Sequence, residues 1–230
     1  MSNLIELNHV TKTYGKKIAL HDVSFTIPVG GKIIGLLGPN GSGKTTLIKT
    51  IMRIIRHQDG EILVNGIPVS YETRKYISFM PDREYLYDTM TVQDSIDYYN
   101  EMFSDFDINR AYSLCQKLGL NVNDPITSLS KGNKEKNVLM LTLARKVPIY
   151  LLDEPLGSLD PVIKHQMLNV IKEISTPDNV IVISTHLIKD TSPILDSAIF
   201  LKNGNVANFF DINSIGKDLE EYYLEVFSNV

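Results

Sequence analysis

The sequence predicts an α/β fold that combines a parallel-type strand–loop–helix unit with an antiparallel β layer. The apolar run Ile33–Leu37 leads into a glycine-rich turn and then into residues with helical spacing. A second continuous apolar run, Ile149–Leu152, ends directly in two acidic residues. The segments Leu4–Val10 and Val23–Ile27 alternate between apolar and polar residues, a pattern typical of antiparallel strands.

Length and composition limit the functions that this chain can have. A chain of 230 residues is long enough for one α/β domain, and 43% hydrophobic residues provide a sizeable core. The net charge of −4 argues against a broad nucleic-acid-binding surface, so we expect no nucleic-acid partner. The single cysteine, Cys115, fits a reducing compartment. Met1–Val10 lacks the features of a signal peptide, and no apolar run approaches the ~20 residues of a membrane helix. A role at a membrane would therefore come through a partner.

Turn residues indicate where the remaining N-terminal strands begin and end. Gly15-Lys16-Lys17 predicts a turn between the two alternating segments, with Tyr14 just before it. Two glycines bracket a short strand at Glu61–Asn65. Tyr76–Met80 is a further predicted strand, and it ends at Pro81-Asp82.

A helical insert is predicted from about residue 88 to residue 137. The segment Thr91-Val92-Gln93-Asp94 resembles a capping box, with aspartate in place of the usual glutamate or glutamine. Apolar residues then recur at helical spacing over Asp94–Phe103 and over Asn109–Leu118. We therefore expect two helices here before the chain returns to the sheet.

The C-terminal part alternates again between helices and strands. The expected elements are a helix from Leu129–Asn133 to about Lys146, a strand at Ile149–Leu152, a helix at Val162–Ile174, a strand at Val180–Ile183, strands at Ala198–Leu201 and Val206–Phe210, and a helix at Leu219–Phe227. Asn203-Gly204 is a hairpin turn signal between the last two strands.

The glycine-rich turn carries a phosphate-binding motif. Gly38, Gly43, Lys44 and Thr45 satisfy the P-loop pattern G-x-x-x-x-G-K-[ST]. Glycines let consecutive backbone N–H groups curl around an oxyanion, and the following helix offers its positive N-terminal end. Lys44 can reach the β- and γ-phosphates, and the Thr45 hydroxyl is placed to bind Mg²⁺. The candidate nucleotide-binding residues are Gly38, Asn40, Gly41, Ser42, Gly43, Lys44, Thr45 and Thr46. The sequence therefore predicts a nucleoside triphosphate site.

Two further strand ends supply candidate catalytic groups. Asp153 and Glu154 follow a buried strand, where open α/β sheets place their ligands. Asp153 suits a Mg²⁺ ligand, and Glu154 suits a general base that deprotonates water for attack on the γ-phosphate. His186 follows another buried strand, so we expect it on the same edge, where it can donate to a γ-phosphate oxygen.

The order and spacing of these motifs resemble the ATP-binding cassette (ABC) ATPases over nearly the whole chain. The matching segments are Gly38–Thr45, Leu129–Asn133, Ile149–Glu154, Ser158-Leu159-Asp160 and His186. The resemblance implies a P-loop NTPase fold with a RecA-like core, an antiparallel β-subdomain and an inserted α-helical subdomain. It also implies that residues 1–230 form a single ABC ATPase domain.

The resemblance also implies a shared site between two cassettes. A second ABC ATPase subunit, identical or different, would sandwich two ATP molecules with this one. Carried over to this sequence, Tyr14 would stack on adenine, while Ser130 and Gly132 would contact the γ-phosphate bound by the other subunit. Asp160 would lie at the subunit contact, and His186 would be the switch histidine. The implied cofactors are ATP and Mg²⁺.

Two positions depart from the pattern of the family. The signature L-S-G-G-Q is replaced by Leu129-Ser130-Lys131-Gly132-Asn133, which adds a cation; similar S-K-G variants occur among bacitracin-resistance-like export ATPases. Asp82 stands where the family usually has glutamine after Pro81. Because Asp82 is shorter and anionic, we expect it to face Mg²⁺ through a water molecule. The alternative is that Asp82 is a loop residue that caps Arg83 to Tyr85 and points to solvent.

Three functions are compatible with these features, and the first is preferred. It is the ATP-hydrolysing subunit of a membrane exporter of drugs or peptides, bound to transmembrane permease subunits on the cytoplasmic face of the cell membrane. The second is a soluble ABC ATPase that acts on nucleic acid or ribosomes, and the third is a small-kinase-type phosphotransferase. The third leaves the signature motif and His186 unexplained.

Overall fold

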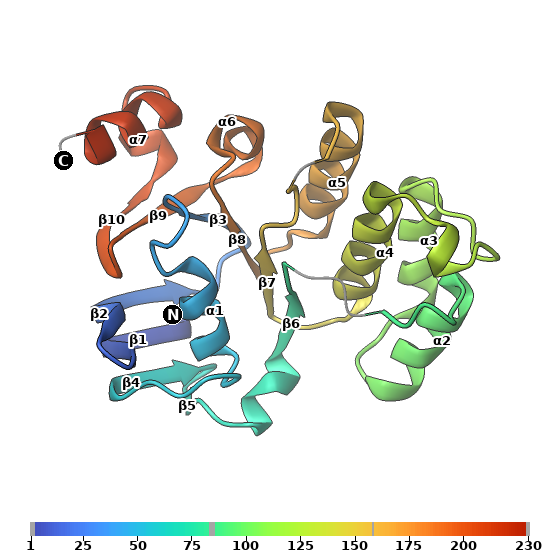
Figure 1. Ribbon diagram of the computed structural model, residues 1–230, viewed down its shortest axis with the longest axis horizontal. Coiled ribbons are helices and arrows are strands. Elements are labelled where there is room, and N and C mark those ends of the chain that lie inside the picture. The colour runs from blue at the N-terminus through green and yellow to red at the C-terminus, as the bar shows by residue number, and fades with distance from the viewer. Residues whose placement is uncertain (1–2, 83–85, 158, 229–230) are drawn as a thin grey trace.

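The described part of the chain forms two β-sheets, a helical insert and further helices beside the sheets (Figure 1). The computed structural model describes residues 3–82, 86–157 and 159–228. The insert lies at one end of the molecule, and the six-stranded sheet runs from β6 (Ile77–Met80) near the insert to β10 (Asn205–Asp211), which lies at the same end as the four-stranded sheet (Figure 1). The predicted α/β class, with an antiparallel sheet and a helical subdomain, is confirmed.

The four-stranded antiparallel sheet has the strand order β2-β1-β4-β5. Its strands are β1 (Asn3–Tyr14), β2 (Lys17–Pro28), β4 (Asp59–Val64) and β5 (Ile67–Pro68). The first two are longer than predicted and meet at a turn that leaves Lys17 in β2. Register shifts on both sides of Val10 and a positive φ of 55° at His9 interrupt the alternation. Bulges of this kind explain why the sequence pattern stopped at Val10.

The six-stranded sheet has the order β10-β9-β3-β8-β7-β6. Its strands are β3 (Lys32–Leu37), β6 (Ile77–Met80), β7 (Ile149–Asp153), β8 (Val180–Thr185), β9 (Ser197–Lys202) and β10 (Asn205–Asp211). All neighbours are parallel except β9 and β10, which form the predicted hairpin. Asn203 and Gly204 both have positive φ, as the expected two-residue turn requires.

The helices agree with the predicted periodicity except at their ends. They are α1 (Lys44–Ile51), α2 (Val92–Met102), α3 (Ile108–Lys117), α4 (Lys131–Ala144), α5 (Pro161–Ile174), α6 (Ile188–Thr191) and α7 (Leu219–Ser228). The Thr91–Asp94 capping box is present at α2. The short α6 was not predicted, because four residues show no helical period.

Helix α4 joins the helical insert to the sheet. It packs against α2 and α3 on one side and against α5 and β6 on the other. Residues 136–144 of α4 are all buried, so this helix has no polar face. The expected insert boundary near residue 137 therefore falls inside one continuous helix.

The predicted site residues at the ends of the parallel strands lie at one edge of the six-stranded sheet. The carboxyl end of β3 leads into the P-loop, β7 ends at Asp153, and β8 ends just before His186. Asp82 follows β6 by two residues. Among the described residues, no helix has the length and apolar character needed to cross a membrane.

Candidate functional site

The P-loop is held in place by close backbone contacts. It connects β3 to α1, and Gly43 caps the helix with a φ of 111°. A Cβ atom at Gly38 would lie 2.3 Å from the Leu201 carbonyl oxygen, and one at Gly43 would lie 2.6 Å from the Ala19 carbonyl oxygen. Glycine is therefore required at both positions because β9 and β2 approach the loop so closely.

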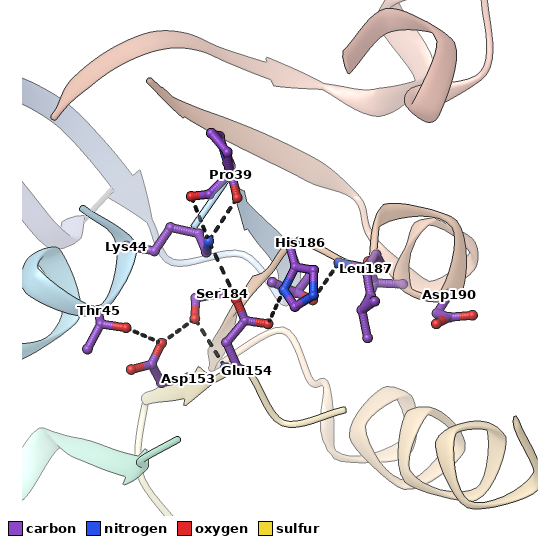
Figure 2. A network of polar contacts seen from close by, with 12 residues as sticks. Pro39, Lys44, Thr45, Asp153, Glu154, Ser184, His186, Leu187 and Asp190 are labelled. Carbon is purple, nitrogen blue, oxygen red and sulfur yellow. Dashed lines mark hydrogen bonds and ion pairs between the residues drawn. The ribbon is translucent and has the colours of Figure 1, made fainter. Parts of the chain in front are cut away.

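Lys44 turns back over the loop that precedes it. Its Nζ donates to the carbonyl oxygens of Gly38 at 2.8 Å and Pro39 at 3.4 Å, as Figure 2 shows. The same Nζ lies 3.4 Å from Glu154 Oε1. The Lys44 side chain is only 6% exposed. The one cation of the P-loop thus sits over the loop and faces the acidic strand end.

Asp153 has one carboxylate oxygen occupied and one free. Thr45 Oγ1 donates to Asp153 Oδ1 at 3.1 Å, and Ser184 Oγ donates to the same oxygen (Figure 2). Asp153 Oδ2 is buried and has no hydrogen-bond partner. Burial raises the pKa of Asp153, and the charges of Asp82 and Glu154 add to this, against the hydrogen bonds from Ser184 and Thr45. An orphaned carboxylate oxygen beside a threonine hydroxyl is a donor set that suits Mg²⁺.

Glu154 bridges a lysine and a histidine. Its Oε1 faces Lys44, and its Oε2 lies 3.0 Å from His186 Nδ1 (Figure 2). Its backbone has a φ of 51°, and its N–H donates to the Ser184 carbonyl oxygen at 3.0 Å. A positive φ in a residue other than glycine is a strained conformation that its surroundings must maintain. Glu154 is largely buried, whereas the His186 side chain is 45% exposed.

Two adjoining cavities open at this edge. One, of about 270 Å³, is lined by Tyr14 together with the P-loop residues Asn40, Gly41, Gly43, Lys44, Thr45 and Thr46. The other, of about 360 Å³, lies toward the helical insert and is lined by Lys131, Glu135, Gly157 and His186. Asn40, Asp82 and Glu154 line both. The structure therefore brings Tyr14, P-loop residues, Asp82 and Glu154 around two cavities that share part of their lining.

The signature residues lie at the start of α4. Ser130 is the N-cap, and its Oγ accepts a hydrogen bond from the Asn133 N–H at 3.3 Å. Gly132 is buried, and a Cβ atom there would lie 2.4 Å from Ile163 Cδ1 of α5. Among the residues that the structure describes, neither Ser130 nor Gly132 lines the two cavities, whereas Lys131 does. Their predicted contact with a second subunit's nucleotide is compatible with this position.

One predicted motif is described only in part. Asp160 is the N-cap of α5, and its Oδ1 accepts hydrogen bonds from the backbone N–H groups of Val162 and Ile163 at 3.0 Å each. Ser158 and the residues Arg83 to Tyr85 lie outside the described residues. The predicted cap of Asp82 on Arg83 to Tyr85 therefore has no structural test here.

Sequence reasoning missed Ser184 as part of the site. Ser184 pairs with Asp153 in the β7–β8 register, and its hydroxyl donates to that carboxylate. The available signal was a serine at the end of a fully apolar strand, next to His186. Lys17 and Ala19 also line the smaller cavity, with no motif to mark them.

A phosphate-binding loop facing a buried acidic pair and a histidine at one sheet edge defines a P-loop nucleotide hydrolase. The sequence model of the ABC transporter family matches residues 20–157. The chain is 31% identical over 226 residues to the ABC transporter ATP-binding protein YtrB of Bacillus subtilis, covering 97% of this chain and 76% of that protein. The chain therefore belongs to the ABC transporter family, as an ATP-binding subunit with ATPase activity.

Other relatives agree over most of the chain. The lantibiotic transport ATP-binding protein SrtF of Streptococcus pyogenes is 26% identical over 205 residues, covering 88% of this chain and 89% of that protein. The solved structure of an ATP-binding subunit of an ABC transporter has a TM-score of 0.88 at 26% identity, covering 97% and 99% of the two chains. A dimeric bacterial ABC transporter cassette has a TM-score of 0.79 at 25% identity, covering 90% and 98%.

Proposed function

We propose that this chain hydrolyses ATP to drive the export of drugs or peptides through transmembrane permease subunits, on the cytoplasmic face of the cell membrane. The observation that carries the proposal is the buried Asp153–Glu154 pair facing the P-loop in a chain of this family. Export is supported by relatives named for lantibiotic transport, linearmycin resistance and Nod factor export. The alternative, a soluble ABC ATPase acting on nucleic acid or ribosomes, has no comparable support. We place the activity in one ABC ATPase domain spanning residues 1–230.

The P-loop would hold the phosphates of ATP and Tyr14 would hold its base. Backbone N–H groups around Gly41 and at the start of α1 offer an anion site, and Lys44 adds the neutralising cation. To reach the β- and γ-phosphates, Lys44 exchanges the carbonyl oxygens of Gly38 and Pro39 for phosphate oxygens. Tyr14 lines the same cavity at the end of β1, and its exposed ring offers a face for adenine stacking.

Three side chains form the proposed Mg²⁺ site. The unpartnered Asp153 Oδ2 and the Thr45 hydroxyl are already joined through Asp153 Oδ1, and Asp82 faces the same cavity. Mg²⁺ would neutralise charge that develops on the phosphates during transfer. Because it keeps several water ligands, the shorter Asp82 can contribute through one of them.

Glu154 and His186 would perform the proton and phosphate chemistry. The Glu154 carboxylate accepts a proton from the attacking water, whose oxygen bonds to the γ-phosphorus while the bond to ADP breaks. His186 contacts Glu154 through Nδ1, which leaves Nε2 free to face a phosphate oxygen. Glu154 forms an ion pair with Lys44 and also contacts His186, so binding of phosphate at Lys44 would release Glu154 from that ion pair.

A second copy or a related subunit would complete each site. Ser130 and Gly132 lie outside the cavities of their own chain, and the dimeric cassette of similar fold supports a paired arrangement. In this arrangement the Ser130 hydroxyl and the N-terminal N–H groups of α4 contact the γ-phosphate bound by the partner.

A separate groove fits the permease partner. It has a volume of about 640 Å³, lies between α2 and the β6 side of the core, and is remote from the P-loop. Tyr71 and Met102 line it and are 78% and 58% exposed. Exposed apolar side chains that gather at a groove mark an interaction surface. We therefore place a short apolar segment of the permease in this groove.

Co-purification tests the partner and the groove together. We expect the tagged wild-type chain to bring down a polytopic membrane protein, identified by mass spectrometry, from detergent-solubilised membranes of its own cell. Met102→Glu should lose most of that protein and keep ATP binding, because it places a charge in the groove. Leu224→Glu on α7, where Leu224 is similarly exposed at 55%, is the matched control and should retain it.

Three results would contradict parts of the proposal. Ribosomes or nucleic acid in place of a membrane protein would favour the soluble alternative. A phosphorylated acceptor without release of inorganic phosphate would indicate a phosphotransferase. Equal recovery of the membrane protein with Met102→Glu and with wild type would remove the groove from the interface.

A further inference from the structure

Lys12 is a buried cation next to the proposed nucleobase site. It lies on β1 two residues before Tyr14. Lys12 is 9% exposed, and its Nζ lies 5.0 Å from the centre of the Tyr14 ring. Among the described residues, no hydrogen bond or ion pair joins this ammonium to another group. The Tyr14 ring is therefore its polar partner.

Charged groups of both signs lie around His57, a neighbour of Lys12. Burial lowers the pKa of His57, and the charges of Arg53 and Lys12 lower it further, against a backbone hydrogen bond at Gly60 and the charge of Asp59. Asp59 is an acidic group in this neighbourhood, and among the described residues it forms no ion pair with Lys12. The protein covers most of the Lys12 side chain and thereby holds its ammonium beside the Tyr14 ring.

We propose that Lys12 is a positioning residue for the nucleobase and acts through Tyr14, an inference that rests on the proposed stacking role of Tyr14. The ammonium lies over the ring and is attracted by its negative face. This contact fixes the plane of a side chain that is 48% exposed and has few other restraints. It also draws ring electron density toward the cation, which favours stacking of an electron-rich purine on the uncovered face.

A double-mutant cycle on the full-length chain tests the inference by calorimetric titration with Mg–ATP. Lys12→Met keeps the apolar stem and removes the charge, and we expect it to raise the Kd about fivefold with kcat at saturating ATP unchanged. Lys12→Arg should restore the Kd to within about twofold, since a guanidinium also binds aromatic faces. Lys217→Met removes a comparable lysine–tyrosine contact, 5.6 Å from the Tyr222 ring, and should leave the Kd unchanged.

The Tyr14→Ala background separates the two proposals. We expect Tyr14→Ala to weaken ATP binding and Lys12→Met to have no further effect in that background, because the two residues act as a unit. If Tyr14→Ala leaves the Kd unchanged, the stacking role itself is wrong. If Tyr14→Ala weakens binding but Lys12→Met does not, only the role of Lys12 is wrong. An equal effect of Lys12→Met in both backgrounds would show that Lys12 does not act through the ring.

A spectroscopic readout checks the contact without nucleotide. The chain has no tryptophan, so Tyr14→Trp places a single tryptophan at this position, which can be excited at wavelengths that the tyrosines do not absorb. We expect Lys12→Met to change the emission of that tryptophan in the free protein, whereas Lys217→Met should not. Identical spectra for all three chains would place Lys12 away from the ring.

Discussion

At the scale of single residues, some groups of the site are identified by local sequence motifs, whereas others reach the site only because two strands pair in the sheet. The P-loop residues and the Asp153–Glu154 pair follow from motifs of adjacent residues, and the structure places them face to face. The hydrogen bond from Ser184 to Asp153 depends on the β7–β8 register, which no local pattern reveals. Lys12 was missed for a different reason: it lies only two residues before Tyr14, but a lysine in a strand predicts a solvated side chain.

Asp82 carries the prediction most particular to this sequence. It lines both cavities, and its charge contributes to the raised pKa of Asp153, so the two carboxylates lie close together. We expect Asp82→Ala to lower kcat about tenfold and to affect ATP binding less, since the P-loop supplies most phosphate contacts. Asp82→Gln, which restores the residue usual in the family, should retain or raise turnover. The measurement is steady-state ATPase activity across a Mg²⁺ titration.

The control for Asp82 is an acid of the same charge outside the site. Glu220→Ala on the exposed start of α7 should leave kcat and its Mg²⁺ dependence unchanged. An unchanged kcat for Asp82→Ala at every Mg²⁺ concentration would show that Asp82 does not face the metal.

At the scale of elements, periodicity predicted the type of nearly every helix and strand but not where each one ends. β1 extends beyond Val10 because bulges restore its alternation after each break. α4 ends at Ala144, two residues before the predicted end near Lys146, because the backbone of Arg145 is extended. The hairpin at Asn203-Gly204 was fully predictable, because that turn depends on two residues alone.

Gly132 lies at the contact between α4 and α5, so its role in packing can be tested separately from its predicted role in phosphate binding. A Cβ atom there would clash with the terminal methyl group of Ile163, which can rotate away, and would lie at an ordinary contact distance of 3.6 Å from Leu159 Cδ2. Alanine also favours a helix by about 1 kcal/mol over glycine. We therefore expect Gly132→Ala to change the free energy of unfolding by less than about 1 kcal/mol. ATPase activity should still fall several-fold, because the methyl group obstructs approach of a partner-bound phosphate.

Chemical denaturation and ATPase assays on the same preparation check this prediction. Gly132→Ala combined with Ile163→Val relieves the remaining contact and serves as the control for packing. If the second change restores the activity, the loss came from packing, and the phosphate contact of Gly132 is wrong.

At the scale of the whole molecule, residues of the helical insert and residues of the core line the same cavity. Lys131 and Glu135 of α4 face Asp82, Glu154 and His186 across the larger cavity. Ser130 and Gly132, the residues that the family resemblance assigns to phosphate, lie outside that cavity. The fold was predictable from the sequence, because the motifs are spread over the whole chain. The division of the site between two subunits came from resemblance alone and stays a prediction.

The central claim is that ATP joins two subunits through these residues, and one measurement tests it most directly. Glu154→Gln removes the proposed base but keeps the shape of the site, so ATP should bind and remain uncleaved. We expect light scattering after size exclusion, at high protein concentration, to show a dimer of Glu154→Gln with Mg–ATP and a monomer without it. Adding Lys44→Ala to that chain should abolish the dimer. A chain that binds ATP yet stays monomeric under these conditions would contradict the shared site.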